Sequence, residues 1–144
     1  SALNPTDRAT GVVTGERAPL PNADVPTRFT FRRFDSVRGV ASIGMSQAHV
    51  EGPEAIRALR ESLFGLASNP KCRRLVLDMA DVYALPSAAC TLLLALADRW
   101  QHAGGAVRLC ALDPEVRRLI VALRLQTRIG LFEDRGKAIS APWE

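Results

Sequence analysis

The sequence predicts an α/β fold in which strands and helices alternate along the chain. Short stretches rich in Val, Ile and Leu alternate with longer stretches whose apolar residues recur at helical spacing. Alanine and leucine outnumber valine, isoleucine and tyrosine, and only 6% of the residues are aromatic although 47% are hydrophobic, which favours a helix-rich mixed architecture over a sandwich. An alternating order implies parallel strands joined by right-handed crossovers, with helices packed on a sheet.

The length and the cysteines indicate a single domain without covalent or metal support. A chain of 144 residues can bury a core of its own. The three cysteines are an odd set without close spacing, which indicates neither a disulfide framework nor a zinc site. No apolar run reaches the roughly 18 residues of a membrane span, and residues 1–27 lack a signal-peptide pattern. We expect a cytoplasmic protein with reduced thiols and with no metal, cofactor or membrane insertion.

The net charge of +4 raises the question of a nucleic-acid partner. The basic residues are scattered and interleaved with 15 acidic ones, and no aromatic platform or helix-turn-helix pattern accompanies them. We therefore expect an ordinary solvated surface and no direct nucleic-acid binding.

The first part of the chain differs in composition from the rest. Residues 1–27 contain four of the nine prolines and show no apolar periodicity, which predicts an arm that is flexible or laid over the surface. One globular domain is expected over residues 28–144. It opens with two predicted strands, at 28–34 and 37–45, separated by a turn at Asp35 and Ser36.

A helix and a buried strand follow. Residues 52–68 predict an amphipathic helix with Pro53 in its first turn and Glu54 at the favourable end of its dipole. Its apolar positions recur at helical spacing: Ile56, Leu59, Leu63 and Leu66. The short run at 73–79 is rich in β-formers and suits a strand that is buried on both faces.

The most apolar helix is predicted from about Ser87 to Ala103. Its apolar residues occupy almost every side of the helical wheel, so we expect a central helix packed on more than one face, with Leu92, Leu93 and Leu96 deeply buried. Gly104 and Gly105 are expected to end it.

The last third of the chain repeats the alternation. Residues 106–112 predict a strand, and Asp113 is a helix cap with Pro114 in the first turn. The helix that follows has a predicted apolar face made of Val116, Leu119, Ile120 and Leu123. A short strand near 129–132 and a helical turn near Lys137 complete the domain.

No catalytic motif is recognisable in this scaffold, and no catalytic residue is assigned. The sequence contains no phosphate-binding loop, no dinucleotide-binding fingerprint and none of the motifs H-E-x-x-H, C-x-x-C and G-x-S-x-G. His49 and His102 are interpreted as surface residues, and Asp78 and Asp81 as turn formers more than as paired carboxylates for acid chemistry or Mg²⁺. Cys90 lies in apolar surroundings, which raise a thiol's pKa and argue against a nucleophile.

Taken together, these features resemble the STAS domain, the family of bacterial anti-anti-sigma factors. The resemblance covers residues 28–140 and follows the family's order through the helix opening GPEA, the strand LVLDMADV, the loop YALPSAAC, the apolar helix ending in HAGG, the strand VRLCAL and the helix DPEVRRLIVALRL. It implies an α/β fold with a four- or five-stranded mixed sheet and helices mainly on one side.

Most of the family carries Asp-Ser-(Ser/Thr)-Gly at the start of the central helix, and the first serine is phosphorylated. The aligned residues here are Pro86, Ser87, Ala88 and Ala89. The resemblance therefore makes Ser87 the phosphorylation candidate, although the preceding acid, the second hydroxyl and the glycine are missing. Because proline lacks an N–H and alanine adds bulk where glycine allows close approach, the departures bear on phosphorylation more than on binding.

Two interpretations of Ser87 remain open at this point. A phosphate at a helix N-terminus would carry about −1.5 to −2 charges and would be accommodated by free N–H groups, so that the fold would survive while an interface would weaken. Alternatively, the hydroxyl only caps the helix by accepting a hydrogen bond from an N–H two or three residues on, which is worth about 1 kcal/mol.

The resemblance implies a non-enzymatic anti-sigma factor antagonist that acts by partner switching. Unphosphorylated, it would bind an anti-sigma factor serine kinase and free a sigma factor; phosphorylation at Ser87 would release it, and a serine phosphatase would reset it. Alternatives are a STAS subunit docking on the ATPase of a phospholipid-transport ABC system, a non-phosphorylated scaffold, and an enzyme or ligand-binding protein that uses Asp78 and Asp81. The partner-binding candidates are Tyr83, Pro86, Ser87, Ala88, Ala89 and Thr91.

Overall fold

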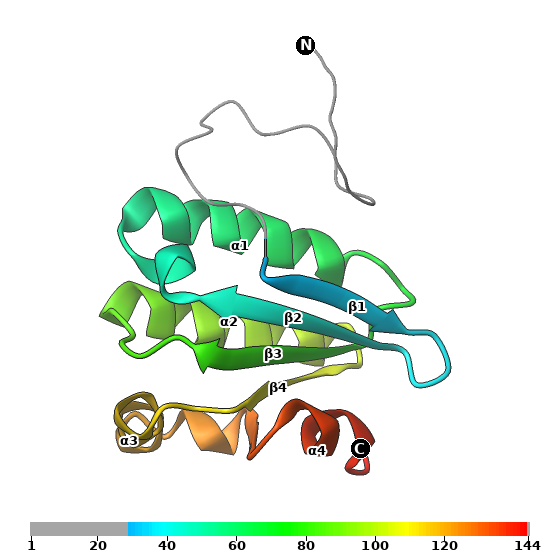
Figure 1. Cartoon of the computed structure of the whole chain (residues 1–144). Coiled ribbons are helices and arrows are strands. Elements are labelled where there is room, and N and C mark those ends of the chain that lie inside the picture. Colours follow the sequence, from blue (N-terminus) through cyan, green and yellow to red (C-terminus); the bar gives the residue numbers. More distant parts are fainter. Residues whose placement is uncertain (1–28, 144) are drawn as a thin grey trace.

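The computed structural model describes residues 29–143, so the predicted N-terminal arm lies outside the described residues. The strands are β1 (Phe31–Asp35), β2 (Val40–Ser46), β3 (Arg74–Asp81), β4 (Ala106–Cys110) and β5 (Gly130–Phe132). The helices are α1 (Pro53–Ala67), α2 (Ser87–His102), α3 (Pro114–Ala122) and α4 (Arg135–Ser140), with two short 3-10 helices, η1 (Gln47–Val50) and η2 (Leu125–Thr127). The alternation predicted from the sequence is confirmed (Figure 1).

The five strands form one mixed sheet in the order β1-β2-β3-β4-β5. β1 pairs antiparallel with β2, and β2 to β5 run parallel to one another. Because neighbouring parallel strands follow one another in sequence, right-handed crossovers bring their connecting helices to the same side. We call the sheet face covered by α1, α2 and α3 the front face and the opposite one the back face.

The front face carries the main hydrophobic core. Side chains of β3 alternate across the sheet, so that Leu75, Leu77 and Met79 belong to the front core while Val76 belongs to a second cluster on the back. All four are 0% exposed, which confirms that this strand is buried on both faces. From α1 the core receives Leu59 and Leu63.

Helix α2 packs against both the sheet and α1, as predicted for a helix packed on more than one face, but its outer side is open to the solvent. Ala88, Thr91 and Leu94 face the solvent, and Leu94 is 36% exposed. The small alanines make this outer side look apolar on a helical wheel although it does not pack. The three leucines predicted to be deeply buried are each at most 3% exposed, and the buried residues are Ala89, Cys90, Leu92, Leu93, Leu96, Ala97 and Trp100.

Two glycines end α2, as predicted. Gly104 has a φ of +83°, in the region that favours glycine. At Gly105 the chain passes so close to β3 that a Cβ atom would lie 1.9 Å from the carbonyl oxygen of Arg73. A side chain at Gly104 would strain the backbone, and a side chain at Gly105 would displace the backbone that leads into β4.

Helix α3 begins where the sequence predicts, because Oδ1 of Asp113 accepts a hydrogen bond from the N–H of Glu115 at 2.9 Å. It ends earlier than its apolar pattern suggests. Leu123 is the C-cap residue and is 50% exposed, so its predicted place on the buried face is wrong. The reason is that Arg124 adopts a φ of +61° and turns the chain away from the helical path. The fully buried residues of α3 are Val116 and Ile120.

The back face is covered by α4 and the residues after it. Arg108 of β4 is 8% exposed and donates hydrogen bonds to the carbonyl oxygens of Ala138 at 2.8 Å, Ala141 at 2.9 Å and Pro142. Its guanidinium lies 3.6 Å from the centre of the Trp143 ring. Since the last carbonyls of a helix lack partners within the helix, Arg108 satisfies the C-terminal end of α4 from the sheet.

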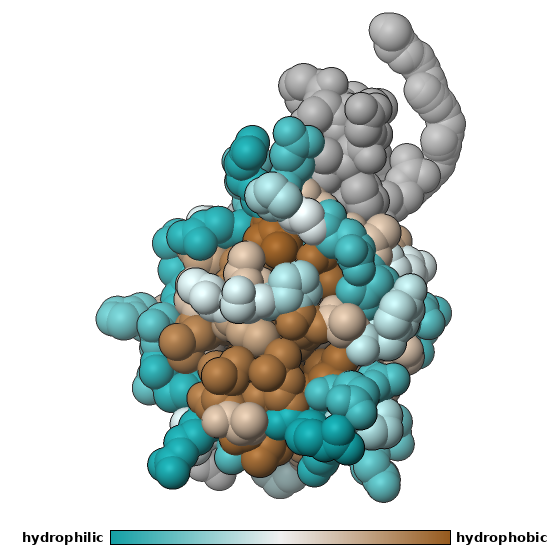
Figure 2. Space-filling view, turned by 90° about the vertical axis from the view of Figure 1, so that its left-hand side faces the viewer, coloured by the Kyte–Doolittle hydropathy of each residue, from teal (hydrophilic) through white to brown (hydrophobic). Residues whose placement is uncertain are grey.

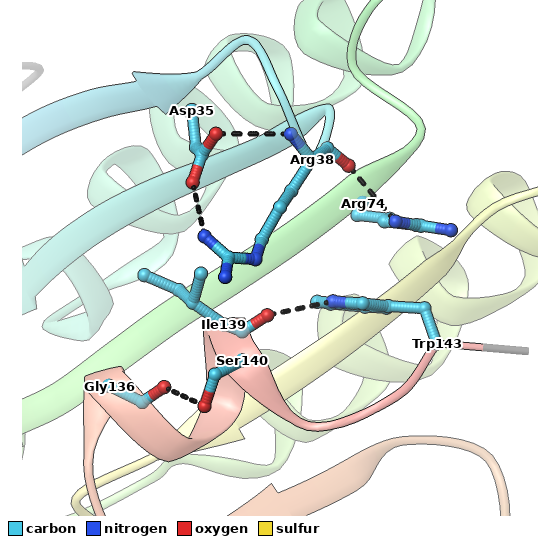
Figure 3. A network of polar contacts seen from close by, with 7 residues as sticks. All are labelled: Asp35, Arg38, Arg74, Gly136, Ile139, Ser140 and Trp143. Carbon is cyan, nitrogen blue, oxygen red and sulfur yellow. Dashed lines mark hydrogen bonds and ion pairs between the residues drawn. The ribbon is translucent and has the colours of Figure 1, made fainter.

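Further polar contacts join α4 to the turn between β1 and β2 (Figure 3). Nε1 of Trp143 donates to the carbonyl of Ile139 at 3.0 Å, and Arg74, whose guanidinium faces the Trp143 ring, donates to the carbonyl of Arg38 at 3.0 Å. Asp35 accepts hydrogen bonds from the N–H and the guanidinium of Arg38, which lower the pKa of its carboxyl group. The side chain of Asp35, the first residue of the predicted turn, thus holds this turn closed.

Within residues 29–143, no helix has the length and apolar character needed to cross a membrane. All three cysteines are free and buried, and burial raises the pKa of each thiol.

Candidate functional site

The carboxyl ends of the parallel strands meet at one edge of the sheet, on the left of Figure 1. There, β2 continues into η1, β3 into a loop over residues 82–86, and β4 into the start of α3. We call this the carboxyl edge. In open sheets with parallel strands, the carboxyl ends are where binding residues gather, because the loops that leave them are close in space but free to differ.

The loop over 82–86 is anchored by two side chains and presents the others. Val82 is 0% and Leu85 9% exposed, and both belong to the front core. Tyr83 is 64% exposed, and Ala84 and Pro86 are also exposed. This alternation fixes the path of the loop while it directs an aromatic ring and a proline toward the solvent.

Gln47 holds the same loop through its backbone. Its Oε1 accepts hydrogen bonds from the N–H groups of Tyr83 at 2.8 Å and Ala84 at 3.0 Å, and its Nε2 donates to the Ala84 carbonyl at 2.9 Å and to Glu51 at 2.7 Å. The side chain is 8% exposed, so these bonds are sheltered from water. Sequence reasoning missed this residue; the only signal was its place directly after a buried strand.

His49 lies beside this clamp, and its interpretation as a surface residue is wrong. It is 2% exposed, its ring stacks on Phe29 with 5.3 Å between the centroids, and its Nδ1 accepts a hydrogen bond from the N–H of Ser46 at 3.0 Å. A histidine in a polar stretch carries no periodic signal for burial, which explains the error. His102 is exposed at the end of α2, as predicted.

Ser87 is the first residue of α2, but it is not the cap. Pro86 is the N-cap residue, with φ −65° and ψ 158°, and its carbonyl accepts hydrogen bonds from the N–H groups of Ala89 at 3.0 Å and Cys90 at 3.2 Å. No side-chain capping bond is present at this helix start, so the interpretation of Ser87 as a cap is wrong. Proline can take the N-cap position because the cap needs an extended backbone and a carbonyl, not an N–H.

The hydroxyl of Ser87 is therefore exposed without a structural task in the described part of the chain. The first turn of α2 contains no acidic residue, and the first N–H groups of an α-helix lack partners within the helix and form its positive end. One turn further, Thr91 is also exposed, but its hydroxyl donates to the Ser87 carbonyl at 3.1 Å. The two hydroxyls thus differ: one is bound locally and the other is available.

Five of the six partner-binding candidates are exposed at the carboxyl edge or on the first turns of α2: Tyr83, Pro86, Ser87, Ala88 and Thr91. Ala89 is the exception. It is 1% exposed and packs in the front core, so it cannot touch a partner in this conformation. A glycine is not needed there, because the methyl group fills space in the core and does not face the loop.

Figure 2 faces the carboxyl edge and shows a broad apolar surface with hydrophilic side chains around it. The exposed uncharged residues at this edge come from three segments that leave it: Ala48 of η1, Tyr83, Ala84 and Pro86 of the loop, and Ala88 of α2. A continuous apolar surface with a polar rim is typical of a protein-binding site.

The two carboxylates considered for acid chemistry do not form a pair. Asp78 is a strand residue and not a turn former; it faces Arg135 of α4 at 3.9 Å on the back face and accepts a hydrogen bond from the N–H of Ala80. Asp81 is exposed at the end of β3. No group of three or more His, Cys, Asp or Glu side chains within residues 29–143 could hold a metal ion. Cys90 is buried, and burial raises the pKa of its thiol.

The comparisons with known proteins agree with this fold. The family model of the STAS domain matches residues 54–138, more than half of the chain, and the chain belongs to this family. The resemblance drawn from the sequence is thereby confirmed. A search of curated proteins finds no match.

Three solved structures illustrate what the fold is similar to. The NMR structure of the protein TM1081 has a TM-score of 0.68 at 12% identity and covers 93% of this chain and 96% of its own. The crystal structure of this Thermotoga maritima protein, described as a proposed anti-sigma factor antagonist, has a TM-score of 0.64 at 14% identity, covering 76% and 90%. An anti-sigma-factor antagonist (STAS) domain protein from Planctomyces limnophilus has a TM-score of 0.66 at 14% identity, covering 77% and 95%. At these identities the likeness concerns the fold.

Proposed function

We propose that this protein is a non-enzymatic anti-sigma factor antagonist that acts by partner switching. Unphosphorylated, it binds an anti-sigma serine kinase through the carboxyl edge and thereby frees a sigma factor. The kinase then phosphorylates Ser87 and is released, and a serine phosphatase restores the binding form. The observation that carries the proposal is the exposed hydroxyl of Ser87, which makes no hydrogen bond within the described residues and directly follows the exposed loop residues Tyr83, Ala84 and Pro86.

A phosphate at Ser87 changes the interface without unfolding the domain. It brings about −1.5 to −2 charges next to the free N–H groups of the first turn of α2, where the helix dipole favours an anion and no acidic side chain repels it. A partner that had covered the neutral hydroxyl and the apolar loop would then have to desolvate a charged group. Its affinity falls for that reason, since a buried charge without a partner is costly.

Pro86 replaces the acid that most of the family carries before the serine. The structure gives the proline a task of its own, because it supplies the N-cap backbone of α2. The kinase of this protein must therefore recognise Ser87 without an adjacent carboxylate. The exposed ring of Tyr83, three residues before Pro86, is the most prominent group available for this recognition.

The decisive test compares Ser87→Ala and Ser87→Asp in titrations against the anti-sigma serine kinase recovered with this protein from its host. We expect Ser87→Ala to bind like wild type and Ser87→Asp to bind at least roughly tenfold more weakly, a loss of about 1.4 kcal/mol. Both variants should melt close to wild type, within the ±0.5 kcal/mol of ordinary surface changes, because no capping bond is lost. Equal binding of all three proteins would contradict a charge-gated interface.

Thr91 offers a matched control, because it is a second exposed hydroxyl one turn along the same helix. In a phosphorylation assay followed by intact-mass measurement, Thr91→Ala should accept one phosphate and Ser87→Ala none. Phosphate on Ser87→Ala would place the acceptor elsewhere. If wild type takes up no phosphate and binds no kinase, the transporter-subunit and scaffold alternatives gain support instead.

A further inference from the structure

The loop over 82–86 cannot satisfy its own backbone. Pro86 has no N–H to donate. The N–H groups of Tyr83 and Ala84 and the carbonyl of Ala84 have no backbone partner in the described part of the chain. All three bond to the amide of Gln47 instead. One side chain therefore supplies the hydrogen bonds that the middle of this loop lacks.

The orientation of the Gln47 amide is supported by Glu51. Nε2 of Gln47 donates to Oε2 of Glu51 at 2.7 Å and to the Ala84 carbonyl at 2.9 Å. A carboxylate accepts hydrogen bonds and donates none, so Glu51 favours the orientation in which the amide oxygen faces the two N–H groups of the loop. Glu51 is exposed, whereas Gln47 is 8% exposed. An exposed carboxylate thus helps to fix a sheltered amide.

The held segment is the one that presents the recognition residues. Tyr83 is 64% exposed, and its own N–H is one of the two bound by Gln47. The loop ends at Pro86, the N-cap residue of α2, directly before Ser87. A loop that already has its binding conformation loses less conformational entropy when a partner binds, so holding it raises affinity without adding a contact.

We infer that Gln47 and Glu51 are positioning residues of the partner site. Gln47 holds the backbone of the loop before the partner binds, and Glu51 acts through Gln47. This role rests on the proposed function, because it requires a protein partner at the carboxyl edge. It adds that the affinity for this partner depends on a side chain that is too buried to offer it much contact area.

The first measurement uses the free protein. Tyr83 is the only tyrosine of the chain, so 3-fluorotyrosine labelling gives one fluorine NMR signal, and it comes from this loop. Gln47→Met keeps a long unbranched side chain but removes all four hydrogen bonds of the amide. The signal should shift or broaden, and amide exchange at Tyr83 and Ala84 should become at least roughly tenfold faster. The amides of β3 and α2 should keep their protection.

The second measurement is a titration of the full chain against the anti-sigma serine kinase recovered with this protein from its host, at about pH 8, where a glutamate carboxyl group is ionised. Gln47→Glu places two carboxylates against each other and should weaken binding at least roughly tenfold. Gln47→Glu/Glu51→Gln restores a donor between the two positions and should bind within about threefold of wild type. Such a rescue distinguishes positioning from a general loss of stability.

Gln101→Glu is the matched control. It makes the same change at an exposed position at the other end of α2 and should bind within about twofold of wild type.

Three results would overturn the positioning role. One is a Gln47→Met protein with an unchanged fluorine signal and unchanged amide exchange. Another is wild-type kinase affinity in a Gln47→Met protein whose loop has loosened, and the third is a double variant that recovers no affinity.

Ser87→Asp separates this role from the proposed function. If Ser87→Asp weakens kinase binding and the Gln47 variants do not, the switch stands and the positioning role fails. If the Gln47 variants weaken binding and Ser87→Asp does not, the charge gate fails and the positioning role stands. A wild-type protein that binds no kinase would contradict both.

Discussion

The two faces of the sheet are stabilised in different ways. On the front face, buried and mostly aliphatic side chains from α1, α2 and α3 and from β2, β3 and β4 form one large cluster. On the back face, a small cluster of Val40, Val76, Cys110 and Ala138 is closed by α4, and α4 is attached through Arg108 and Trp143. Hydrophobic burial is non-directional, whereas part of the attachment of α4 consists of directed hydrogen bonds from one guanidinium.

This difference implies that a substitution on one face affects the stability of the domain differently from a substitution on the other. Removing a methyl group from the front core weakens the whole domain, because every strand and helix there shares the cluster. Removing the Arg108 guanidinium should loosen α4 and the residues after it before the rest of the fold, since three of their carbonyl groups lose a buried donor. Three measurements test this difference between the faces.

The largest effect is expected for Leu96→Ala, which opens a cavity at a 0% exposed position of the front core. The free energy of unfolding should fall by about 2–5 kcal/mol, measured by denaturant titration. Leu94→Ala is the control on the same helix, because Leu94 is 36% exposed, and it should change stability by less than about 1 kcal/mol. A similar loss in both variants would mean that α2 is packed on all sides after all.

A smaller loss is expected for Arg108→Met, which keeps the apolar stem but removes the donors to three carbonyls. Global stability should fall by about 1–3 kcal/mol. Amide exchange should increase mainly in residues 135–143, which would show local release of α4. Arg118→Met is the matched control at an exposed ion pair and should be nearly neutral. Uniform exchange over the whole chain in Arg108→Met would remove the distinction between the faces.

The smallest effect concerns the thiol on the back face. Burial, and next the nearby Asp78 carboxylate, raise the pKa of Cys110 to about 12 from an ordinary value of 9.0. Because the folded pKa is the higher one, the thiol's contribution to stability is complete below pH 9 and is lost between pH 9 and about 12. The free energy of unfolding of wild type should therefore fall more steeply above pH 9 than that of Cys110→Ala, in denaturant titrations at several pH values. Parallel slopes would contradict a shifted thiol.

Periodic hydrophobic packing could be predicted from the sequence, whereas the polar contacts between distant residues could not. The front face was predictable because burial against a sheet imposes a period of about 3.6 on α1 and α2, and Pro114 and Gly104 mark element ends by local chemistry. The long-range polar contacts were not predictable. Gln47 binds a loop 36 residues away and Arg108 binds carbonyls 30 or more residues away, and neither pairing leaves a periodic pattern in the sequence.

The candidate site contains one prediction that is confirmed and one that is wrong, and both concern Ser87. The position of Ser87 at the start of α2 was predicted from the change between a β-rich run and an apolar helix, and it is confirmed. The capping bond expected from the Ser87 hydroxyl is absent, because Pro86 supplies the N-cap backbone. The sequence preferences for N-caps rank side chains, so they do not reveal a cap that uses the backbone alone. Phosphorylation of Ser87 and the arm over residues 1–27 remain predictions.

The clamp formed by Gln47 bears on how partner specificity can change during evolution. Its amide recognises only backbone atoms of Tyr83 and Ala84, so the shape of the loop does not depend on which side chains these positions carry. Substitutions at the exposed positions can then alter the recognition surface without remodelling its support. Duplicated copies of such a domain can in this way diverge to bind different protein partners while they keep one fold.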